Sequence, residues 1–111
     1  MDLYKKFIYV NPDDTAGEVD NSRMYPASSL RAVYLEDATS VYFLLQDAGQ
    51  VDQTIVDITI STGNGKSFIK EFVEELNYGK EAVINLGDKE DGSAFSGLVD
   101  LSTAPAITEG S

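Results

Sequence analysis

A glycine-rich loop followed by a lysine and a serine is the most suggestive chemical motif in the sequence. Residues 54–76 read TIVDITISTGNGKSFIKEFVEEL, with Gly65, Lys66 and Ser67 between a predicted strand and a predicted helix. In a phosphate-binding loop, backbone amides and the lysine hold the phosphates and the hydroxyl binds Mg²⁺. The first glycine of that motif would fall at Ile60, where a β-branched residue resists the tight turn. The motif is therefore incomplete, and a degenerate nucleotide-binding loop ranks third among the functions considered.

Other catalytic and metal-binding chemistry is restricted by composition. The chain has no histidine and no cysteine, which excludes imidazole bases, thiolate ligands and disulfides. Two loops concentrate carboxylates without the alternating spacing and glycine of a calcium loop. Those residues are Asp13, Asp14, Glu18, Asp20, Asp88, Glu90 and Asp91. We interpret them as solvated turn residues, and predict no metal, no cofactor, no catalytic residues and no enzymatic activity.

The charge of the chain limits its partners. Eight basic and nineteen acidic residues give a net charge of −11, which argues against binding nucleic acid. The acidity serves solubility or docking onto a basic surface. The start of the sequence does not resemble a signal peptide, and no apolar run reaches the length of a membrane span. We therefore expect no membrane partner and a cytoplasmic site of synthesis.

The hydrophobic pattern predicts one α+β domain over residues 1–103, followed by an extended C-terminal tail over 104–111. Strands are expected at 3–10, 30–35, 40–46, 54–61 and 82–87, and one amphipathic helix at 65–77. The fold is an antiparallel β-meander or small barrel-like sheet packed by that helix, with a C-terminal hairpin in which 97–102 pairs back on 82–87.

Local signals refine three features of this fold. Residues 11–23 are predicted to be an irregular loop that continues through Pro26. Asn64 is a candidate helix N-cap, and Gly79 suits the left-handed position after the helix.

One strand is apolar on both faces, which bears on partners. In residues 40–46, Val41, Phe43 and Leu45 share one face, whereas Tyr42 and Leu44 share the other. Such a strand is usually buried on both sides, by the helix or by another subunit. Tyrosine is also favoured at interfaces, although these tyrosines can instead cover the edge of the core. The predicted interface residues are Tyr4, Tyr9, Tyr34, Tyr42 and Leu44.

Five segments in order carry a family resemblance: KFIYV, RAVYLED, TSVYFLL, VDITI and KSFIKEFVEEL. This pattern resembles small, mostly uncharacterised proteins of marine bacteriophages, of the cyanophage type, associated with the virion. The resemblance covers roughly residues 5–77. It implies a small β-meander capped by a helix, and it carries no catalytic residues across.

The leading functional hypothesis is a phage structural protein, either a capsid decoration or cement subunit or another small virion component. It would act by protein–protein contacts with itself, with other phage structural proteins, or with both, as a homo-oligomer or as part of a larger assembly. We expect it in the virion after assembly in the host cytoplasm, and otherwise in the cytoplasm. The alternative is a cytoplasmic, acidic binding or regulatory module of a phage.

Overall fold

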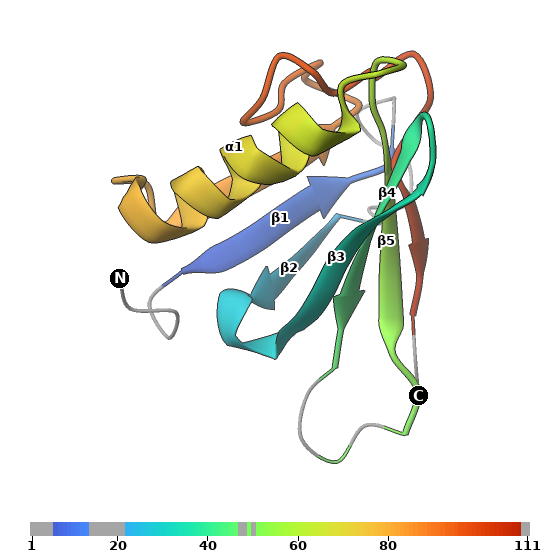
Figure 1. Cartoon of the computed structure of the whole chain (residues 1–111). Coiled ribbons are helices and arrows are strands. Elements are labelled where there is room, and N and C mark those ends of the chain that lie inside the picture. The colour runs from blue at the N-terminus through green and yellow to red at the C-terminus, as the bar shows by residue number, and fades with distance from the viewer. Residues whose placement is uncertain (1–5, 14–21, 47–48, 50, 110–111) are drawn as a thin grey trace.

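Two β-sheets and one helix form the fold, which is of the α+β class (Figure 1). The computed structural model describes residues 6–13, 22–46, 49 and 51–109. The elements in chain order are β1 (Phe7–Asn11), β2 (Arg23–Pro26), a 3-10 turn (Ala27–Ser29), β3 (Leu30–Asp37), β4 (Ser40–Leu45), β5 (Thr54–Thr59), α1 (Gly65–Tyr78), β6 (Val83–Asp88) and β7 (Ala106–Thr108).

The two sheets differ in topology. In the three-stranded sheet β1 lies at the centre, antiparallel to β2 and parallel to β6. The four-stranded sheet has the order β3-β4-β5-β7, and every neighbouring pair is antiparallel. The predicted meander is therefore confirmed for β3 to β5. Within the part of the chain that the structure describes, neither sheet closes into a barrel.

The core lies between the inner faces of the two sheets, and the period-two alternation of each strand supplies it. Val41, Phe43 and Leu45 of β4 are fully or almost fully buried, as the sequence pattern predicts. Ile8 and Val10 of β1, in the opposite sheet, are likewise completely buried.

Helix α1 completes the core through a cluster of phenylalanine rings. Phe68 and Phe72, one turn apart, are buried on its inner face. The ring of Phe43 lies 4.9 Å from that of Phe72 in an edge-on arrangement, and Phe95 lies 5.5 Å from Phe68. Edge-to-face pairs at such distances add to the gain from burial. The cluster therefore joins the helix to the four-stranded sheet and to the segment after β6.

The helix ends differently from the prediction. Asn64 occupies the N-cap position, but its side chain makes no capping hydrogen bond. Gly79 has φ −66° and ψ 147°, so the left-handed conformation expected there is wrong. The cap comes instead from Lys6, whose Nζ donates to the carbonyl oxygens of Gly79 and Glu81, both at 2.9 Å, and of Glu75 at 3.4 Å. Glu75 O also accepts from the Gly79 amide at 3.0 Å, and Gly79 and Glu81 lie just beyond the helix. Lys6 thus places a positive charge at the C-terminal end of the helix and satisfies the carbonyls that follow it.

Two further expectations are corrected. Residues 23–26, predicted as irregular, form β2, because Met24 and Tyr25 pair with Tyr9 and Ile8 of β1. This pairing depends on a strand distant in the sequence, which local composition does not reveal.

The predicted return of 97–102 along 82–87 is also wrong. The amide of Phe95 binds the carbonyl of Asn85, whereas Ser61 and Asp100 link the later segment to the end of β5. Within the segment predicted as an extended tail, residues 106–108 form β7 and pair with β5.

Replacement of Lys6 by methionine tests this cap. Lys6→Met keeps most of the side-chain volume but removes the donors, leaving partly buried carbonyls unsatisfied. We expect the free energy of unfolding to fall by about 1–3 kcal/mol, measured by urea denaturation. Lys70→Met, at an exposed position of α1, is the matched control and should change stability by less than about 0.5 kcal/mol. Equal effects of the two variants would contradict a capping role for Lys6.

Candidate functional site: the outer face of the four-stranded sheet

The predicted interface residues fall into separate places. Tyr34 and Tyr42 are cross-strand partners with ring centroids 5.7 Å apart, and Leu44 lies on the same face of β4. Tyr9 lies on the other sheet, where its hydroxyl donates to Asp88 Oδ2 at 3.2 Å. Tyr4 lies outside the described residues. The structure therefore brings together three of the five residues.

The strand register extends this group into a two-row surface. One row crosses all four strands as Tyr34, Tyr42, Asp57 and Ala106. The adjacent row crosses them as Ala32, Leu44, Ile55 and Thr108. Each strand contributes alternate residues, so these eight side chains point away from the core. We call these eight residues the outer sheet face.

Side chains on the outer sheet face are only partly covered. Tyr42, Leu44, Ile55 and Asp57 are of intermediate burial, and Tyr34 is 40% exposed. Seven of the eight residues carry no charge, and the exception is Asp57. A tyrosine-bearing surface with one charged residue among eight, on a strongly acidic chain, has the composition of an interface core, from which charged residues are depleted.

Asp57 is in an unfavourable environment at the middle of this face. Its Oδ1 atom is buried and has no hydrogen-bond partner among the described residues. Burial raises the pKa of the Asp57 carboxyl, a hydrogen bond from Ser40 lowers it, and the negative charges of Asp37 and Glu36 raise it further. A buried carboxylate without a positive partner costs free energy.

The neighbouring carboxylate of Asp37, unlike Oδ1 of Asp57, has hydrogen-bond donors. Asp37 accepts hydrogen bonds from the amide of Thr39 at 2.9 Å and from its hydroxyl at 3.2 Å. These bonds lower the pKa of Asp37, the backbone one most. The pKa of Tyr42 is raised, first by desolvation and then by Asp57 and Glu36. The end of the outer sheet face beside Tyr42 therefore has a negative potential.

The glycine-rich loop is packed as a structural connection. The amide of Ser61 donates to Leu98 O and that of Asn64 donates to Ser61 O, so neither points to a ligand. A side chain at Gly65 would collide with Leu35 of β3, which explains the glycine there. The preceding strand, β5, is antiparallel to both of its neighbours, unlike the strand of a nucleotide-binding sheet.

The acidic loops give no metal centre among the described residues, which contain no group of three carboxylates placed to hold an ion. Asp88 instead stabilises its own turn. Its Oδ1 accepts from Asn11 Nδ2 and from the Asp91 amide, both at 3.1 Å. The other predicted cluster falls mostly on residues 14–21, outside the described part of the chain.

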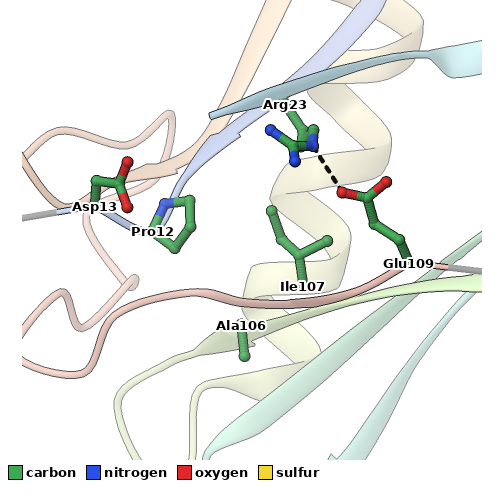
Figure 2. A pocket seen from close by; sticks show the side chains of 6 residues that line it. All are labelled: Pro12, Asp13, Arg23, Ala106, Ile107 and Glu109. Atoms are coloured by element: carbon green, nitrogen blue, oxygen red, sulfur yellow. Dashed lines mark hydrogen bonds and ion pairs between the residues drawn. The ribbon is translucent and has the colours of Figure 1, made fainter. Parts of the chain in front are cut away.

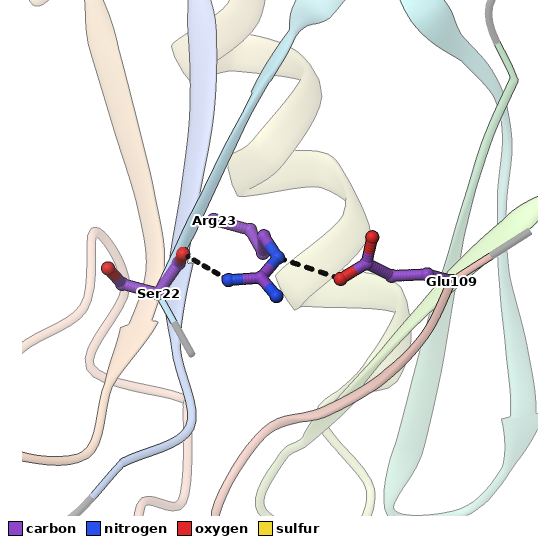
Figure 3. Close-up of polar contacts among 3 residues, drawn as sticks. All are labelled: Ser22, Arg23 and Glu109. Carbon is purple, nitrogen blue, oxygen red and sulfur yellow. Dashed lines mark hydrogen bonds and ion pairs between the residues drawn. The ribbon is translucent and has the colours of Figure 1, made fainter. Parts of the chain in front are cut away.

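A cavity of about 380 Å³ lies where the edges of the two sheets meet (Figure 2). Arg23 Nε contacts Glu109 Oε1 at 2.7 Å across it, and Arg23 also donates to Ser22 O at 2.9 Å (Figure 3). Its lining residues are Pro12, Asp13, Arg23, Ala106, Ile107 and Glu109. Because Arg23 and Glu109 bind each other, we interpret the pair as a link between β2 and the end of β7. Such half-exposed pairs contribute about 0–1 kcal/mol.

The raised pKa of Asp57 predicts a pH-dependent penalty on stability. A carboxyl whose pKa is higher in the folded than in the unfolded chain binds more protons when folded, so stability falls as pH rises above 3.8, the ordinary pKa of an aspartate. Asp57→Asn removes that loss. We expect its unfolding free energy, relative to the unchanged protein, to increase between pH 3 and pH 7 in urea titrations. Asp91→Asn controls for net charge, and an identical pH profile for both variants would contradict the assignment.

Comparisons with known proteins leave the assignment to the geometry of the site: no family model, curated protein or solved structure matches the chain. Among the described residues, no helix is long and apolar enough to cross a membrane. The outer sheet face is therefore the strongest candidate site on the strength of its register, composition and exposure.

Proposed function

We propose that this chain is a non-catalytic protein-binding domain that acts through the outer sheet face. The observation that carries the proposal is the alignment of two four-residue rows across the sheet, which contain a contacting tyrosine pair and one charge. Tyrosines and aliphatic side chains held by a rigid sheet lose little conformational entropy on binding. Eight residues suffice for the centre of an interface whose full side has roughly 20–30 residues.

The resemblance to marine bacteriophage proteins supplies the biological setting of the proposal. In that setting the domain is a small structural component of the virion, a capsid decoration or cement subunit, and adheres to its neighbours through this face. The geometry suits adhesion because the four-stranded sheet is anchored by the phenylalanine cluster on its inner side and presents its outer side to a partner.

A second candidate is an acidic module that binds a single basic protein in the host cytoplasm. The observation that favours it is the net charge of −11, together with the carboxylate of Asp57, which has no basic group among those that shift its pKa. Affinity capture from phage-infected cells separates the two. Recovery of virion proteins supports the structural role, and recovery of one basic, non-virion protein supports the module.

A charge placed on the outer sheet face tests the proposal. Leu44→Glu puts a carboxylate beside Tyr42 and Ile55, and its desolvation opposes any partner that covers this face. We expect at least about tenfold weaker association with cyanophage capsid shells, read by sedimentation velocity of the purified chain mixed with those shells. Val73→Glu adds the same charge to α1, where Val73 is 45% exposed, and should associate normally.

Circular dichroism and thermal melting establish that both variants are folded. An unchanged protein that stays monomeric and does not sediment with shells would reject the virion role. Equal association of both variants would reject the outer sheet face as the contact surface.

A further inference from the structure

Asp57 gives the outer sheet face a chemical preference that goes beyond adhesion. The carboxylate sits on β5, an inner strand of the sheet, between Tyr42 of β4 and Ala106 of β7. Its buried Oδ1 accepts no hydrogen bond from any described residue. No basic side chain is among the groups that shift its pKa. Oδ1 itself is closed to solvent, but the Asp57 side chain as a whole is only partly buried. A cation laid on the exposed part of the carboxylate from outside the chain would therefore offset the cost of a charge that has no basic partner in the folded protein.

The surroundings of the carboxylate define the shape of that donor. Beside it lies Tyr42, in contact with Tyr34, and these rings offer aromatic faces to a flat cation. In the next row Leu44 and Ile55 are uncharged and partly exposed, and suit the methylene stem of a long side chain. An arginine guanidinium combines a planar stacking surface with a fork of donors for a carboxylate, which an ammonium group lacks.

Charge also argues against a second copy as the occupant. Two outer sheet faces packed against each other would bring two copies of Asp57, and the nearby Glu36 and Asp37, into one interface. Like charges placed together in an interface oppose association. A partner that presents a positive charge surrounded by apolar groups is instead attracted to the carboxylates of this face.

We propose that the outer sheet face binds an arginine side chain of a partner protein, with the guanidinium on Tyr42 and Asp57 and its aliphatic flank on Leu44 and Ile55. This inference rests on the proposed protein-binding function and specifies the partner's chemistry. It assigns Asp57 to recognition of the partner. Stability of the fold does not account for an aspartate at this position, because the ionised carboxylate destabilises the unbound domain.

Short peptides test this preference directly. The probe is N-acetyl-Val-Arg-Val-amide, titrated into the full chain and followed by amide chemical shifts in ¹H–¹⁵N NMR spectra. We expect saturable shifts centred on β4 and β5, near Tyr42, Leu44 and Asp57. The peptide with citrulline in place of arginine has nearly the same shape and no charge, and should bind about tenfold more weakly because a charge-assisted contact is lost.

Variants of the chain provide the matched control. Asp57→Asn should remove the difference between the arginine and citrulline peptides, whereas Asp91→Asn, which loses an equal charge from an exposed turn, should keep it. Replacement of arginine by lysine should also weaken binding, since the planar fork is gone.

Several outcomes would overturn the inference. They are equal binding of arginine and citrulline peptides, shifts centred on Glu71, Glu74 and Glu75 of α1, or no saturable shifts at millimolar peptide. If peptides fail but Leu44→Glu still abolishes association, the arginine preference alone is rejected. If Leu44→Glu also has no effect, the protein-binding role of this face is rejected with it.

Discussion

The packing of four phenylalanine rings holds the layers of this domain together. Phe43 comes from the four-stranded sheet, Phe68 and Phe72 from the helix, and Phe95 from the segment that returns along the three-stranded sheet. The amide of Phe95 binds Asn85 of β6, so the cluster connects to both sheets. The chain has no disulfide to hold its layers together, so their association depends on the burial of apolar surface. The four rings supply large apolar areas in specific geometry.

Long-range polar contacts complement this packing at the ends of elements. Lys6 binds three carbonyls at and beyond the C-terminal end of α1, and Asp88 ties the end of β6 to Asn11. These contacts join residues 69 to 77 positions apart. Lys6 and Asp88 therefore stabilise the fold. Asp57 differs from them, because its buried Oδ1 has no hydrogen-bond partner among the described residues.

The two sides of the four-stranded sheet have opposite roles. Its inner face is completed by the helix and the other sheet, and this rigid support holds the outer rows in place. On the outer face, an ionised Asp57 lowers the stability of the free domain, because burial disfavours its charge. Binding sites often contain a charged residue that lowers the stability of the fold and lies among ordered, uncharged neighbours.

The sequence by itself determined the α+β class, the meander of β3 to β5 and the helix, and it grouped Val41, Phe43 and Leu45 on one face of β4. These features follow from hydrophobic periodicity, which reflects local backbone geometry. Tertiary structure decided the pairing of β2 with β1, the cap supplied by Lys6, and the placement of β7 beside β5. It also decided which tyrosines share a surface. Tyr42 and Asp57 lie on the outward sides of their own strands, and only the register between β4 and β5 makes them neighbours. Register and long-range contacts depend on the packing of distant segments, and for that reason local pattern could not predict them.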